Sequence, residues 1–159
     1  MMDALQLGIP TITAGAGRIG IMPLPDEESI QDIADWGATL VVSMTTPREM
    51  DGPLAPHLSP RGIAWEHLPI VDFGAPQPDT QREWTRIAPA IVARIAAGEG
   101  VIVHCRGGCG RSGMIALRLL VEMGEQPEVA LSRLRAVRPC AVETREQYDW
   151  AAAGVPQTV

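Results

Sequence analysis

Apolar positions along this chain change their spacing repeatedly, as expected where strands alternate with helices. Short runs of β-branched and aliphatic residues predict strands around Ile12 and over 19–22, 39–43, 63–69 and 101–103. Apolar residues three or four apart predict a long helix over 79–97. Shorter helices are expected over 29–36, 112–123, 128–137 and 146–153. The alternation predicts an α/β fold with a mainly parallel central sheet flanked by helices.

Prolines and small polar residues indicate where several of these elements begin. Thr46 followed by Pro47 predicts an N-cap and the first position of a short helical turn. Asp79 is expected to cap the long helix, and Pro89 should bend that helix. Residues 52–62 contain three prolines and predict a loop or a short helix.

Composition restricts the class of protein. We expect the 159 residues to form one domain over 1–159, because no linker or repeat divides them. No apolar run approaches the ~20 residues of a membrane helix, and the N-terminus lacks the pattern of a secretory signal. The net charge of −6 argues against nucleic acid as a partner. All 13 basic residues are arginine, which excludes lysine Schiff-base chemistry and lysine-dependent phosphate loops.

A glycine motif near the N-terminus matches the dinucleotide-binding pattern only by its letters. Residues 15–20 read GAGRIG, a literal G-x-G-x-x-G. A dinucleotide site needs a helix directly after the motif, but Pro23 and Pro25 follow it. We therefore expect a turn between two strands.

Residues 101–113 read VIVHCRGGCGRSG and carry most of the functional information. A predicted strand runs into a glycine-rich loop that begins with Cys105, and Arg111 lies where the next helix starts. Backbone N–H groups converging at a helix N-terminus favour negative charge, both that of a thiolate and that of a phosphate. Arginine can contact two phosphate oxygens at once. The loop is predicted to activate a nucleophile and bind an anion; a buried structural cysteine beside a turn is the alternative.

This loop resembles the signature of the cysteine-dependent tyrosine and dual-specificity phosphatases, particularly the kinase-associated type. The resemblance covers most of the chain and implies a protein-tyrosine-phosphatase-like fold with no metal or other cofactor. It implies Cys105 as the nucleophile that forms a phosphocysteine, Arg111 as the bidentate phosphate ligand and Ser112 as support for the departing thiolate. The predicted phosphate-binding residues are Arg106, Gly107, Gly108, Cys109, Gly110 and Arg111.

Phosphate-ester cleavage is easier when an acid protonates the leaving oxygen. Residues 72–76 read DFGAP and resemble the mobile acid loop of the same phosphatases, so Asp72 is predicted to be the general acid. A simple turn at Asp72 is the alternative, because aspartate before glycine is common in turns. Asp79 is the second candidate acid, although helix capping explains it adequately.

Three further residues are expected to support the site. Thr144 and Gln147 match the water-positioning loop of larger tyrosine phosphatases, while Glu143 stands where that loop has glutamine. A polar helix N-terminus capped by Thr144 is an equally good interpretation. His104 is expected to order the loop backbone and to favour the thiolate mildly.

The cysteines and histidines predict neither a disulfide framework nor a metal site. Three cysteines are an odd number, and a thiolate enzyme suits a reducing compartment, so we expect a cytoplasmic protein. Cys109 could form a protective disulfide with Cys105 under peroxide. We favour a small side chain that only lines the loop, because a bridge across so short a loop is geometrically demanding.

The predicted function is hydrolysis of phosphotyrosine in proteins, extending to phosphoserine and phosphothreonine, with a phosphorylated protein or peptide as partner. Low aromatic content predicts a shallow pocket. The alternative is a phosphoinositide or inositol phosphate phosphatase, which Arg106, as the only extra basic residue in the loop, favours little. A sulfurtransferase would lack the Arg-Ser-Gly ending, and an idle binding module would have lost the cysteine, arginine or acid. The sequence does not indicate an oligomeric state.

Overall fold

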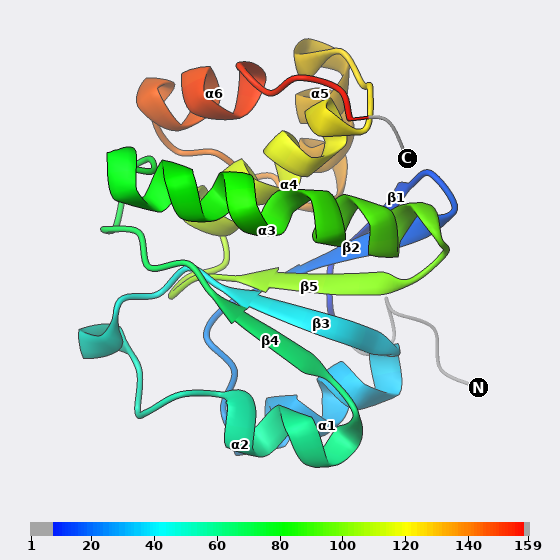
Figure 1. Cartoon of the computed structure of the whole chain (residues 1–159), viewed down its shortest axis with the longest axis vertical. Coiled ribbons are helices and arrows are strands. Elements are labelled where there is room, and N and C mark those ends of the chain that lie inside the picture. Colours follow the sequence, from blue (N-terminus) through cyan, green and yellow to red (C-terminus); the bar gives the residue numbers. More distant parts are fainter. Residues whose placement is uncertain (1–7, 158–159) are drawn as a thin grey trace.

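The computed structural model describes residues 8–157 and contains a five-stranded sheet between two layers of helices (Figure 1). The strand order is β1-β2-β5-β3-β4. The strands are β1 (Thr11–Ala14), β2 (Gly17–Met22), β3 (Ala38–Ser43), β4 (Ala64–His67) and β5 (Gly100–His104). Only β1 pairs in an antiparallel sense, with β2. The predicted α/β fold with a mainly parallel sheet is confirmed.

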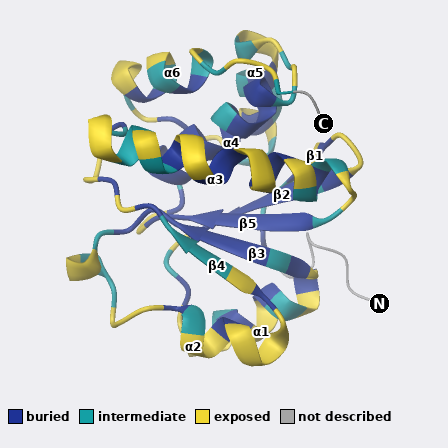
Figure 2. Cartoon of the chain, in the orientation of Figure 1, coloured by how far each residue is buried: buried dark blue, intermediate teal, exposed yellow. Residues whose placement is uncertain are grey.

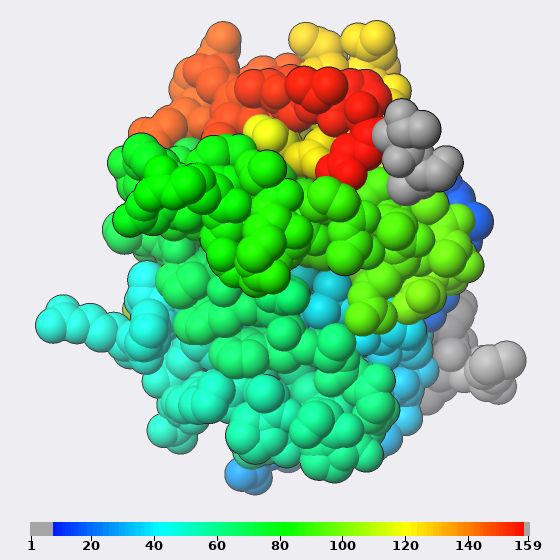
Figure 3. All heavy atoms as spheres, in the orientation of Figure 1, coloured from blue at the N-terminus to red at the C-terminus, as the bar shows by residue number. Residues whose placement is uncertain are grey.

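Helices cover both faces of the sheet. One face carries α1 (Glu27–Trp36) and α2 (Ala55–Leu58). The other carries α3 (Pro78–Ala96), α4 (Gly110–Glu122), α5 (Pro127–Val137) and α6 (Arg145–Ala152). In the space-filling view, α3 forms a ridge across the molecule with the C-terminal helices above it (Figure 3). No helix among residues 8–157 is long and apolar enough to cross a bilayer.

The central strands are buried on both faces because their apolar residues serve two cores (Figure 2). Val101 and Val103 of β5 pack in the core beneath α3 and α4, whereas Ile102 packs with α1 and α2. This alternation follows from the two-residue period of a strand. It fixes β5 in the middle of the sheet, so the loop that follows its carboxyl end has a rigid support.

Two predictions about local structure have different outcomes. The glycine motif over 15–20 is a turn between β1 and β2, as predicted. The N-cap of α3 was wrongly predicted: Gln77 occupies that position, and Asp79 lies in the first turn, paired with Arg82. Pro78 takes the first helical position, where the missing N–H has no partner to lose.

Gly113 allows α4 to approach the segment before α6. A Cβ at Gly113 would lie 2.7 Å from the backbone nitrogen of Val142 and 2.8 Å from Ala141. Because backbone atoms cannot move as a side chain can, Gly113→Ala should lower the free energy of unfolding by about 1–3 kcal/mol. Thermal unfolding measures this. Gly107→Ala is the matched control, since nothing lies within 4 Å of its Cβ position; equal melting temperatures for both variants would contradict the prediction.

Candidate active site

Cys105 follows the last residue of β5 and lies buried at the bottom of the loop that leads into α4. Its sulfur is 3.3 Å from the hydroxyl oxygen of Ser112 in the first turn of that helix. Gly108 in the loop has a φ of 73°, and a Cβ there would lie 2.7 Å from the backbone of Met22 and Pro23. The loop therefore requires glycine at this position for both its conformation and its close packing.

The carbonyl groups of the loop point outward and are held by the surrounding protein. Arg138 donates from Nε to the carbonyl oxygen of Gly108 at 2.8 Å and from Nη2 to that of Gly107 at 3.0 Å. The backbone N–H of Leu24 donates to the carbonyl of Arg106 at 3.1 Å.

The N–H groups of the same peptides face the opposite way, because N–H and C=O are antiparallel in a trans peptide. No cis peptide bond occurs among residues 8–157. In that part of the chain, no protein group accepts a hydrogen bond from the N–H groups of residues 106–109. The loop thus presents a ring of unpaired donors, which is the arrangement that binds an anion.

Arg111 is almost completely buried, and Glu49 holds one edge of its guanidinium. Nη1 donates to Oε1 of Glu49 at 2.7 Å, and Nη2 donates to Oε2 at 2.8 Å. Nη1 also donates to the carbonyl oxygen of Ile70 at 2.9 Å. Nε has no partner in the described chain. The edge formed by Nε and Nη2 therefore retains one unpaired N–H on each nitrogen.

Sequence reasoning missed Glu49, which comes from a different part of the chain. A single 3-10 turn over Pro47–Glu49 positions it, capped by Thr46 as predicted. The Glu49 carboxylate accepts from the backbone N–H of Thr46 at 2.9 Å. The hydrogen bond from Arg111 is the main reason that the pKa of Glu49 falls to about 2. The Thr-x-x-Glu spacing of a capping box was a signal for the turn, but nothing in it pointed to Arg111.

Asp72 lies on the loop between β4 and α3, next to the same arginine. Its Oδ1 is 3.4 Å from Nη2 of Arg111, and its side chain is about half exposed. Oδ1 also accepts from the backbone N–H of Phe73, a residue with a φ of 62°. The structure thus brings Asp72 and Arg111 together, whereas Asp79 lies at the exposed start of α3.

Gln147 ties α6 to the Asp72 loop. It is buried, its Oε1 accepts from the backbone N–H of Glu143 at 2.8 Å, and its Nε2 donates to the carbonyl oxygen of Gly74 at 3.2 Å. Thr144 caps α6 by accepting from the backbone N–H of Gln147. The exposed Glu143 carboxylate packs against Gly110, where a Cβ would overlap it. All three residues therefore border the site, and Thr144 does serve as a helix cap.

His104 connects the loop to a chain of buried hydrogen bonds. The indole N–H of Trp65 donates to the hydroxyl oxygen of Ser43 at 2.7 Å, and that hydroxyl lies against Nε2 of His104. Nδ1 of His104 is 3.2 Å from the carbonyl oxygen of Cys105. Because indole can only donate, the hydroxyl proton of Ser43 is free to point at Nε2, which leaves the ring proton on Nδ1 to bind Cys105.

The prediction for Cys109 was wrong. Cys109 forms a disulfide with Cys140, which lies between α5 and α6, so it neither lines the loop as a free thiol nor bridges to Cys105. Cys105 is the one free cysteine of the described chain. The odd cysteine count concealed one bridge and one free nucleophile. The disulfide joins the loop to the same segment that supplies Arg138.

No group of three or more His, Cys, Asp or Glu residues suited to hold a metal ion occurs within residues 8–157. The site therefore consists of a buried thiol, a ring of N–H groups, a buried guanidinium and an exposed carboxyl group. Such a site can accept a tetrahedral oxyanion, attack it and supply a proton.

Comparison with known proteins agrees with this geometry. Residues 15–151 match the family model described as Swiss Army Knife protein, DSP-PTPase phosphatase domain. Human protein tyrosine phosphatase type IVA 3 is 30% identical over 124 residues, which cover 74% of this chain and 65% of the human protein. The chain spans between 42% and 65% of the length of the curated relatives it matches.

Two solved structures share the fold over most of both chains. Tk-PTP in the active form has a TM-score of 0.72 and 33% identity, covering 84% of this chain and 88% of its own. Kinase associated phosphatase with its catalytic-site cysteine replaced by serine has a TM-score of 0.77 and 22% identity, covering 90% of each chain.

The imidazole of His104 should stay neutral at physiological pH. Burial is the main cause that lowers its pKa from 6.5 to about 4. An NMR titration should show no change in the His104 ring signals between pH 8 and about 5.5. In the unfolded chain the ring takes up a proton near pH 6.5, so the associated stability should fall as the pH drops from there toward about 4. A ring that titrates near 6.5 in the folded protein would refute this.

Proposed function

The chain belongs to the cysteine-dependent tyrosine and dual-specificity phosphatase family, and on that premise we propose that it hydrolyses phosphotyrosine in proteins through a phosphocysteine. The observation that carries the proposal is the unpaired Nε and Nη2 edge of the buried Arg111. Burial alone would lower the pKa of Arg111, but its hydrogen bonds with Glu49 raise it, so the charge persists. A buried N–H donor without a partner is unfavourable until a ligand supplies the acceptor.

The first step is attack on phosphorus by the Cys105 thiolate. Arg111 and the loop N–H groups hold the equatorial oxygens, which carry the charge in the transition state. Asp72 gives its proton to the departing oxygen, so the leaving group is a neutral alcohol or phenol. Sulfur now carries the phosphoryl group.

The second step is hydrolysis of the phosphocysteine. Asp72, now ionised, accepts a proton from water as the water oxygen attacks phosphorus and the sulfur–phosphorus bond breaks. Ser112 stabilises the departing thiolate by donating its hydroxyl hydrogen across the 3.3 Å separation. Thr144 and Gln147 line the side from which water approaches, and Gln147 retains one amide hydrogen that is not committed to Gly74.

The rim of the site supports an aromatic phosphoester as the preferred substrate. Val71 and Phe73, on either side of Asp72, are 73% and 59% exposed. Large apolar side chains on a loop surface are available to pack on a phenyl ring. Phosphoserine and phosphothreonine lack this ring, and we expect them to be weaker substrates.

A substrate panel tests the proposed function. Phosphotyrosine, phosphoserine and phosphothreonine peptides, phosphoinositides and a small aryl phosphate are compared between the wild-type protein and Cys105→Ser. We expect phosphate release from the aryl phosphate and the phosphotyrosine peptides, with essentially no turnover by Cys105→Ser. Turnover of phosphoinositides alone would favour the alternative, and release that survives in Cys105→Ser would reject the mechanism.

Asp72→Ala should slow turnover by about 10²- to 10⁴-fold on substrates with poor leaving groups, because the proton donor is lost. The effect should shrink on a nitrophenyl phosphate, whose leaving group needs no proton. Asp79→Ala is the control and should behave as wild type. An Asp72→Ala rate that is unchanged on a phosphotyrosine peptide would show that another group supplies the proton.

Glu49→Gln should lower kcat/KM by about 10- to 100-fold, because the guanidinium loses the partner that sets its angle. A rise in the inhibition constant of inorganic phosphate would locate the effect at the anion site. Arg48→Ala, in the same turn, is the control. Wild-type values of both constants in Glu49→Gln would show that Arg111 is oriented without this carboxylate.

A further inference from the structure

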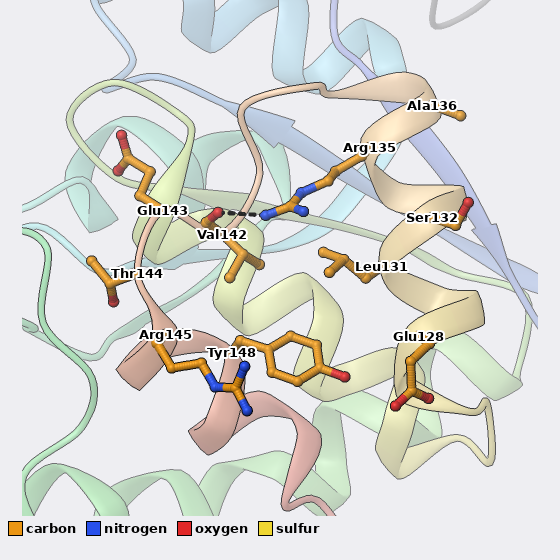
Figure 4. Close-up of a pocket in the computed structure, with 10 residues that line it drawn as sticks. All are labelled: Glu128, Leu131, Ser132, Arg135, Ala136, Val142, Glu143, Thr144, Arg145 and Tyr148. Atoms are coloured by element: carbon orange, nitrogen blue, oxygen red, sulfur yellow. Dashed lines mark hydrogen bonds between the residues drawn. The ribbon is translucent and has the colours of Figure 1, made fainter.

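A groove of about 1,020 Å³ lies between α5 and residues 142–148, beside the anion loop (Figure 4). Leu131 of α5 and Tyr148 of α6 project into it, and Val142 forms part of its apolar floor. A volume of this order accommodates several side chains of a peptide.

The groove is continuous with the active site at one end. Glu143 and Thr144 line this end. Glu143 packs on Gly110 of the anion loop, and the hydroxyl of Thr144 donates to the carbonyl oxygen of Phe73 at 3.5 Å. A polypeptide whose phosphate occupies the loop therefore passes the mouth of the groove.

The two arginines of the groove are already neutralised or occupied. Arg135 donates to the carbonyl oxygens of Ala141 and Val142, both at 2.9 Å (Figure 4). Arg145 forms an ion pair with Asp149 at 3.0 Å. Neither guanidinium is free to attract an acidic ligand.

The two carboxylates of the groove are not neutralised. Glu128 and Glu143 are exposed, and neither takes part in an ion pair within residues 8–157. The phenol of Tyr148 hydrogen-bonds to Glu128, which holds that carboxylate at the far end of the groove without cancelling its charge. The groove thus has an apolar floor with an unpaired negative charge at each end.

We propose that this groove binds a basic segment of the phosphorylated substrate polypeptide, with an arginine or lysine placed against Glu128. The inference rests on the proposed function and extends it by naming the substrate class. The alkyl stem of such a residue packs on Leu131 and Tyr148 while its charged end meets the carboxylate. The net charge of −6 attracts such a segment from a distance.

The test compares phosphotyrosine peptides that differ only in flanking charge. Arginine is scanned over the four positions on each side of the phosphotyrosine, with alanine as the reference, and kcat/KM is measured for the wild type, Glu128→Gln and Glu27→Gln. Glu27→Gln removes the same charge from exposed α1, on the opposite face. A small aryl phosphate reports catalysis that does not involve the groove.

We expect one or two arginine positions to raise the wild-type kcat/KM by about threefold or more, as one or two exposed charge contacts allow. High salt should abolish the gain. Glu128→Gln should lose it while keeping wild-type rates on the aryl phosphate and on the alanine peptide, and Glu27→Gln should retain it.

Hydrolysis of the aryl phosphate with no preference among the peptides would overturn the inference and leave the proposed function standing. An arginine preference that Glu128→Gln retains would also overturn it, because the basic residue would then bind elsewhere. A protein that hydrolyses neither the aryl phosphate nor any peptide would overturn both.

Discussion

The positive charge of Arg111 is buried, and the arrangement of the site depends on how that charge is shared. Glu49 binds one edge of the guanidinium in a two-pronged contact, and the adjacent edge keeps its N–H groups unpaired. A buried charge with no partner would be strongly destabilising, and a guanidinium with every N–H bound could not take a ligand. The single carboxylate satisfies both requirements: it stabilises the empty site and leaves the anion its share of donors.

The loop around Cys105 follows the same logic with backbone groups. Arg138, Leu24 and His104 bind carbonyl oxygens on its outer side, so the N–H groups are left facing the thiol. Because the partners that fix these carbonyls belong to distant segments, the anion site is preorganised by the whole fold rather than by the loop alone. The Cys109–Cys140 disulfide adds a covalent link between the loop and the segment that carries Arg138.

Local patterns predicted the parts of the structure that depend on local chemistry. The alternation of apolar runs predicted the sheet and its helices, and the sequence around Cys105 and Arg111 predicted where the anion loop would form. Glu49 and Cys140 escaped prediction because they are linked to the loop only by folding, 62 and 31 positions away in sequence. Asp79 was misassigned as a cap because Pro78 moves the helix start one residue ahead of it.

The most direct test of the account is to trap the intermediate on sulfur. The wild-type protein is mixed with a phosphotyrosine peptide, quenched in acid within a single turnover and mapped by mass spectrometry. The account predicts a phosphoryl group on the fragment that contains Cys105, at a level that rises and decays with product release. Steady product formation with no phosphoryl group on Cys105, or with one on another residue, would contradict it.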